Sequence, residues 1–176
     1  AMDYWPNEDA VTWFAQKIFP LIKQQWPEAR FHIVGSRPSE KVLKLDDMEG
    51  VNVTGSVDDV RPYIQYATVV VAPMQIARGI QNKVLEAMAM AKPVVVTTMG
   101  LEGINARHGK EILIADDADR FMDEITGLFK SGKGPALGDA AREKVGKDGG
   151  WGGAVGGWGG WGRWSRGGGG GGGWAG

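Results

Sequence analysis

The sequence predicts an α/β fold in which helices cover both faces of a parallel sheet. Residues 68–73 and 93–98 are short apolar runs rich in β-branched side chains, which is typical of strands buried on both faces. Residues 80–91, between these strands, carry apolar side chains at helical spacing. A strand, a helix and a second strand within about 30 residues form one crossover unit with parallel strands.

The remaining elements alternate along the chain in the same way. Apolar residues at helical spacing predict a first helix that Asn7 caps, that Pro20 interrupts and that Pro27 ends. Ser39 is predicted to cap a short helix, and Asp116 or Asp117 a later one. Further strands are predicted over residues 30–35, 51–54 and 111–115, and helices over residues 39–43, 57–67 and 117–129.

The composition excludes several classes of function. The chain has 176 residues, which suits one ordinary domain, and its net charge of −1 provides no basic field for nucleic acid. The absence of cysteine excludes disulfides, thiol catalysis and thiolate metal sites. His32 and His108 are too scattered to suggest a metal cluster. No signal peptide or membrane span is recognisable, which predicts a cytoplasmic location.

The last part of the chain has a different composition. From Gly149 onward nearly all residues are Gly or Trp, as in a flexible linker. The tryptophans partly follow helical spacing, although glycine costs a helix about 1 kcal/mol per residue relative to alanine. We therefore interpret residues 1–133 as one domain and residues 134–176 as a C-terminal helix and tail. We hypothesise that many glycines of the tail stand in place of other residues.

Polar residues suited to an anionic ligand lie in the loop after residue 73. Ligands of open α/β sheets bind at the carboxyl ends of the strands. Gly79 allows close approach to the backbone, and Arg78 adds a charged, bidentate donor. The predicted helix begins with the free amides of Ile80, Gln81 and Asn82, and such a helix start attracts anions.

Lys83 and Glu86 lie in the first turns of the same predicted helix. Helical side chains tilt toward the N-terminus, so that Glu86 leans toward the ligand end and is able to accept two hydroxyl hydrogen bonds. Alternatively, Lys83 and Glu86 form an exposed i,i+3 ion pair worth a few tenths of a kcal/mol. The spacing alone leaves both interpretations open.

At these residues the chain resembles a known family. RGIQNKVLEAMAMAKPVVVT resembles the donor-binding signature of retaining glycosyltransferase family four, which has the GT-B fold. The runs MDYWPNEDAV, VTGSVDDVRPYI and VVVAPMQIARGIQNKVLEAMAM are similar to sugar transferases associated with exosortase and exopolysaccharide systems. The resemblance covers residues 2–128 and implies a Rossmann-like domain, one half of a GT-B fold, whose first strand is missing here.

The resemblance also implies roles for individual residues. Glu86 matches the second glutamate of the family motif, which contacts the nucleotide ribose, and Gly79 to Gln81 match the amides that contact sugar and diphosphate. Asn82 and Lys83 belong to the same donor-binding run. The segment Gly55, Ser56 and Val57 matches the backbone that receives the base, and Arg61, one turn further on, is placed to flank base or phosphate. Arg78 departs from the family, which has its first glutamate there.

The family often holds the diphosphate with a cation near the first loop, where Tyr4 to Asn7 offer only neutral groups. We expect Arg78 to supply that charge and to act in catalysis by stabilising the leaving diphosphate, together with Lys83 and the helix that starts at Ile80. The implied function is binding of a nucleoside diphosphate sugar by an enzyme that transfers a hexose to a glycan or lipid-linked acceptor in polysaccharide biosynthesis. No metal or cofactor is implied beyond the donor itself.

The family's acceptor domain is also missing from the sequence. We therefore expect these residues alone to be inactive, and we expect any contact with the inner face of the cell membrane to run through that domain. Two alternatives remain. In the first, the chain is a degenerate nucleotide-binding scaffold, which is favoured because Arg78 stands where the family has its first glutamate. In the second, it is a nucleotide-sugar epimerase, but that enzyme needs catalytic carboxylates and histidines that the sequence does not offer.

Overall fold

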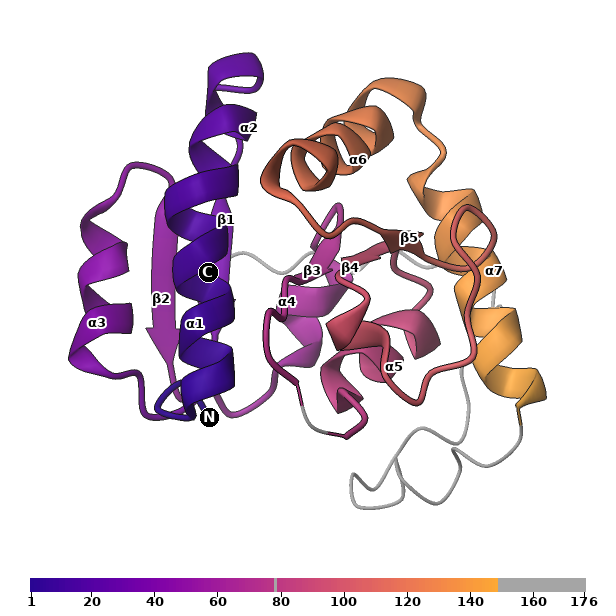
Figure 1. Ribbon diagram of the computed structural model, residues 1–176, viewed down its shortest axis with the longest axis horizontal. Helices are drawn as coiled ribbons and strands as arrows, with labels where there is room; N and C mark the ends of the chain where they lie inside the picture. Colours follow the sequence, from indigo (N-terminus) through magenta and orange to yellow (C-terminus); the bar gives the residue numbers. More distant parts are fainter. Residues whose placement is uncertain (78, 149–176) are drawn as a thin grey trace, which may run out of the picture.

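The computed structural model describes residues 1–77 and 79–148 (Figure 1). The described residues form a mixed α/β fold with parallel strands, as predicted. The first sheet pairs β1 (Phe31–Val34) with β2 (Val51–Gly55). The second has the order β3 (Val70–Ala72), β4 (Val94–Val96) and β5 (Leu113–Ile114). The Gly/Trp tail lies outside the described residues.

The sheet predicted as one unit is divided in two. Among the described strands, no pairing joins β1 or β2 to β3, β4 or β5. In Figure 1, β1 and β2 lie with α1 to α3, whereas β3 to β5 lie with α4, α5 and α7. The prediction that the first family strand is missing stays a prediction.

The predicted crossover unit is present as β3, α5 (Asn82–Ala89) and β4. The helix is shorter than the predicted 80–91. It begins late because Gly79 has a φ of +77° and Gln81, the N-cap residue, is extended. It ends early because Ala91 adopts a left-handed φ of +59°, which stops helix propagation.

The first predicted helix is interrupted near Pro20, but it starts before Asn7. Helix α1 (Trp5–Trp13) has Tyr4 as its N-cap residue, and Pro6 follows in the first turn, where proline is favoured. The prediction that Asn7 caps this helix is therefore wrong. A π-helical segment, η1 (Phe14–Ile18), then leads into α2 (Phe19–Gln25), and Pro20 lies in the first turn of α2.

The predicted helix over residues 57–67 is reduced to α4 (Arg61–Gln65). The Asp59 carboxylate accepts a hydrogen bond from the Arg61 amide at 2.9 Å, and this side-chain turn competes with helix formation. Two predicted caps are confirmed: Ser39 is the N-cap residue of α3 (Glu40–Leu43), and Asp117 is the N-cap residue of α6 (Ala118–Ser131). The remaining elements are η2 (Lys44–Asp47), η3 (Met99–Leu101) and α7 (Gly134–Lys147).

One aromatic core joins the two sheets. The ring of Phe14 in η1 lies 4.5 Å from that of Phe31 in β1 and 5.8 Å from that of Phe121 in α6. Val95 of β4 belongs to the same buried cluster. A second cluster packs α5 against β3, β4 and Ala141 of α7, so that the helix after residue 133 covers the crossover helix.

Candidate functional site

The loops after β3 and β4 are tied together at the carboxyl ends of their strands. The Thr97 hydroxyl, buried after β4, donates to the Met74 carbonyl oxygen and accepts from the Gly100 amide at 3.1 Å. A Cβ atom on Gly103, whose φ is +77°, would lie 2.6 Å from Cγ1 of Ile80. The loop after β4 therefore packs directly on the predicted ligand loop.

Lys83 reaches from α5 to the first turn of α1. Its Nζ donates to Asn7 Oδ1 at 2.8 Å and lies 3.7 Å from the Met74 thioether. The side chain is partly buried, and this burial lowers the pKa of the amine to about 8. Lys83 makes no ion pair with any described residue. The alternative of an exposed Lys83–Glu86 pair is thus wrong, because Asn7 holds the amine instead.

Glu86 lies one turn further along α5 and is partly buried. Burial raises the pKa of its carboxyl group. Like Lys83, Glu86 has no ion-pair partner within the described ranges. The start of α5 thus carries one cation and one anion, each partly desolvated and neither neutralised by its neighbour.

The predicted anion-binding backbone is accessible. Gly79 is exposed, and the space where its Cβ would stand contains no described atom within 4 Å. Ile80 is 44% exposed, Asn82 is exposed and Gln81 is partly buried. The first amides of a helix have no acceptor within that helix, so this turn is able to bind an anion. Arg78, the predicted catalytic residue, lies outside the described residues.

The predicted base-binding segment follows β2. Gly55 ends that strand with a φ of +69°, Ser56 is exposed and Val57 is partly buried. Arg61 makes a bidentate ion pair with Asp59, with Nη2–Oδ2 at 2.8 Å and Nε–Oδ1 at 2.9 Å. No hydrogen bond joins residues 55–57 to α5 within the described part of the chain. The structure brings together Lys83, Asn7 and Met74, but it does not link the segment after β2 directly to them.

Sequence reasoning missed Asn7 as a partner of Lys83. The two residues are separated by 76 positions, and no local pattern announces a contact between the first turns of two helices. The neutral character of residues 4–7 was the available signal. It predicted that a charge must come from elsewhere in the chain.

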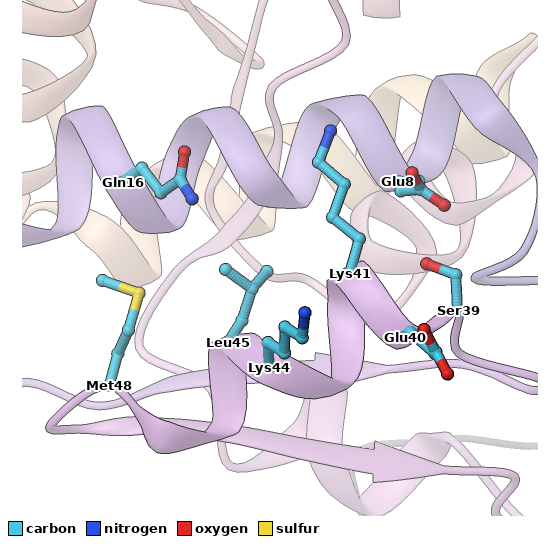
Figure 2. A pocket seen from close by; sticks show the side chains of 8 residues that line it. All are labelled: Glu8, Gln16, Ser39, Glu40, Lys41, Lys44, Leu45 and Met48. Carbon is cyan, nitrogen blue, oxygen red and sulfur yellow. The ribbon is translucent and has the colours of Figure 1, made fainter.

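A hollow between α1 and α3 has no relation to this cluster (Figure 2). None of the predicted site residues borders it. Its lining mixes two acids with two lysines and consists of Glu8, Gln16, Ser39, Glu40, Lys41, Lys44, Leu45 and Met48. In Figure 2, Lys41 extends toward the helix that carries Glu8 and Gln16. This hollow is therefore not the predicted donor site.

The histidines have structural partners. His108 Nδ1 accepts from the Ile114 amide at 2.8 Å, and its Nε2 lies 3.7 Å from Glu124 Oε1. His32 Nδ1 lies 3.5 Å from Asn52 Oδ1. Within residues 1–77 and 79–148, no three acidic, histidine or cysteine side chains gather as a metal site would require. None of the described helices combines the length and apolar character that a membrane span needs.

Comparison with known proteins identifies the family. Residues 1–131 match the family of glycosyl transferases group 1. The chain belongs to this family. A curated relative, an uncharacterized 44.6 kDa protein in the cps region of Klebsiella pneumoniae, is 26% identical over 137 residues. The match covers 73% of the chain and only 35% of the relative, so the chain spans about a third of that protein.

Several solved structures share the fold. TarM superposes with a TM-score of 0.70 at 21% identity, over 82% of this chain and 30% of TarM. Sucrose-phosphate synthase from Thermosynechococcus elongatus superposes with a TM-score of 0.64 at 20% identity, over 78% of this chain and 37% of the synthase. HepE from Anabaena, solved with UDP and glucose, superposes with a TM-score of 0.64 at 16% identity, over 77% of this chain and 40% of HepE. The α/β architecture is thus that of GT-B glycosyltransferases.

Proposed function

We propose that this chain is the donor-binding domain of a retaining glycosyltransferase of family four, and that its donor is a nucleoside diphosphate sugar. The observation that carries the proposal is the start of α5. There a partly buried lysine and a partly buried glutamate lack ion-pair partners among the described residues. Both lie within two turns of an exposed, glycine-containing loop. A ligand that carries both hydroxyl groups and phosphates suits this pair.

The proposed roles follow the chemistry of each group. Glu86 accepts hydrogen bonds from the ribose hydroxyls, and the amides of residues 79–82 bind phosphate oxygens. The backbone of residues 55–57 receives the base, with Arg61 beside it. Arg78 stabilises the leaving diphosphate. The proposed reaction uses no metal and no cofactor besides the donor.

Two comparisons support the donor class and the biological setting. HepE was solved with UDP and glucose, and the Klebsiella relative comes from a cps region. We infer that the whole enzyme transfers a hexose to a glycan or lipid-linked acceptor in exopolysaccharide synthesis, in the cytoplasm or at the inner face of the membrane. The acceptor and any membrane contact belong to a second domain.

A thermal-shift panel with UDP, GDP, ADP and CDP tests donor binding. A ligand that binds only the folded state adds about 2.7 kcal/mol of stability at a hundredfold excess over Kd. We expect one nucleotide to raise the Tm clearly more than the other three. The absence of any shift at millimolar concentrations would favour the scaffold function instead.

The 176-residue chain by itself should not transfer sugar. A GT-B active site closes between two domains, and closure both completes the site and excludes water. The purified chain, incubated with the nucleotide sugar of the preferred base and with glycan acceptors, should show no turnover. Measurable transfer would contradict the proposal that this chain supplies the donor half alone.

A further inference from the structure

The ammonium of Lys83 is partly desolvated but has no counter-ion among the described residues. It contacts the amide oxygen of Asn7 at 2.8 Å and the thioether of Met74 at 3.7 Å. A cation removed from water costs free energy unless an anion or full hydrogen bonding replaces the water. An ammonium has three donors, and one amide oxygen with one weak sulfur acceptor leaves this demand incompletely met.

Three segments meet at this ammonium. Asn7 lies in the first turn of α1, Lys83 lies in the first turn of α5, and Met74 follows β3 by two residues. Met74 and Lys83 follow the carboxyl end of β3, where an open α/β sheet places its ligand, and the hydrogen bond to Lys83 brings Asn7 to the same place. Residues 4–7 carry only neutral side chains and Glu8 follows them in the same turn, so that Lys83, 76 positions away, brings a positive charge to Asn7.

The chemistry of Asn7 suits a holder of a cation that must stay available. Its Nδ2 donates to the carbonyl oxygen of Ala1 at 3.0 Å, which orients Oδ1 toward Lys83. The amide oxygen accepts one ammonium hydrogen and adds no charge. An aspartate there would neutralise the ammonium and repel a phosphate group.

We propose that Lys83 is a cation that binds the diphosphate of the donor, and that Asn7 is the residue that positions it. The inference rests on the proposed function and places on α5 a positive charge that binds the diphosphate. Lys83 contacts the ligand, whereas Asn7 acts through Lys83.

Titration with three probes tests Lys83. UDP contains base, ribose and diphosphate, uridine lacks the diphosphate, and inorganic pyrophosphate lacks the nucleoside. Loss of one charge-assisted hydrogen bond corresponds to roughly a tenfold to hundredfold loss of affinity. Lys83→Met should lower the affinities for UDP and pyrophosphate by that factor and leave the affinity for uridine unchanged. Lys44→Met removes the same charge from η2, and it should change none of the three affinities.

Asn7 is tested by a loss and a rescue. Asn7→Leu should weaken UDP severalfold without affecting uridine, because the freed lysine no longer points at the phosphates. Asn7→Gln keeps the amide oxygen and should restore part of the UDP affinity. A purely structural asparagine would instead weaken UDP and uridine equally, and its loss would lower the Tm of the free protein in proportion.

The outcomes separate the two proposals. Unchanged pyrophosphate affinity in Lys83→Met, or equal losses for UDP and uridine, overturns the assignment of Lys83 while the donor-binding function stands. Pyrophosphate binding that depends on Lys83, without nucleotide binding, supports the cation site and overturns the donor-binding function. If the wild-type chain binds none of the three probes at millimolar concentration, both proposals fail.

Discussion

The backbone of α7 at Gly138 touches the backbone of Ala91, two residues after the end of α5. A Cβ atom added to Gly138 would overlap the carbonyl oxygen of Ala91 and lie 2.6 Å from its carbonyl carbon. Ala91 is the residue whose left-handed backbone ends the α5 region. Helix α7 therefore supports, by direct backbone contact, the turn that ends the helix carrying Lys83 and Glu86, and only glycine permits this contact.

Gly138→Ala should lower the free energy of unfolding by about 1–3 kcal/mol, the usual cost of overpacking. The clashing atoms are backbone atoms, which cannot rotate aside like a flexible side chain. Urea denaturation measures the change. Gly146→Ala is the matched control in the same helix, because no described atom lies within 4 Å of its added Cβ. That control should stabilise by up to about 1 kcal/mol, and equal effects of the two substitutions would contradict the close contact.

Ala91→Gly should raise the free energy of unfolding by about 1 kcal/mol. A residue with a side chain pays that order of cost in the left-handed region, whereas glycine does not. Ala89→Gly, two residues earlier within α5, should destabilise by about 0.5–1 kcal/mol for lack of the helix-forming methyl group. Thermal denaturation of both variants checks the opposite signs. A loss of stability in Ala91→Gly would show that the left-handed turn is not the native conformation of this residue.

Local chemistry predicted much of the fold. The β-branched runs around β3 and β4 and the caps Ser39 and Asp117 were readable because each depends on a few neighbouring residues. The loop at Gly79 and the helix that carries Lys83 and Glu86 followed from the same kind of pattern.

The predictions were wrong where a distant or competing interaction determines the local structure. The length of α4 is set by the Asp59 carboxylate, which replaces helical hydrogen bonds with a turn. Asn7 carries a typical capping side chain, but Ala1 and Lys83 occupy it instead. Strand pairing is also non-local, so that the division between β1 and β3 had no signal in any single segment.

Lys83 should make the stability of the folded protein depend on pH. Its pKa falls from 10.5 to about 8 on burial, so the unfolded state binds more protons between these values. Stability contributed by this residue therefore rises with pH from about 8 to 10.5. The contacting groups from neighbouring elements, Asn7 and Met74, are neutral, and the one acid nearby on α5 is Glu86.

Lys83→Met should accordingly be more stable than wild type at pH 7, by up to about 3 kcal/mol. The difference should shrink as the pH rises through this window, because the wild-type amine is then neutral in both states. Urea denaturation at several pH values between 7 and 10 measures it. Lys44→Met, which removes an exposed lysine, should show no such trend. A constant difference across the range would mean that the amine is solvated in the folded state.

Glu86→Gln should weaken nucleotide binding on the order of tenfold, if the carboxylate holds the ribose. Each hydrogen bond to a charged acceptor contributes roughly 1.5–3 kcal/mol, less what water supplies. The substitution keeps the shape of the side chain. It should not destabilise the fold at neutral pH, because burial already disfavours the charged carboxylate and raises its pKa.

A double cycle with a 2′,3′-dideoxy nucleotide isolates the ribose contact. The ligand without hydroxyl groups makes no bond for Glu86 to lose, so Glu86→Gln should change its affinity much less than that of the ribonucleotide. The coupling between the two changes measures the interaction itself. Glu124→Gln, a matched change on α6 beside His108, should show no coupling with either ligand. Coupling near zero for Glu86, in a variant that folds normally, would remove the carboxylate from the ribose and leave it as a partly buried acid of α5.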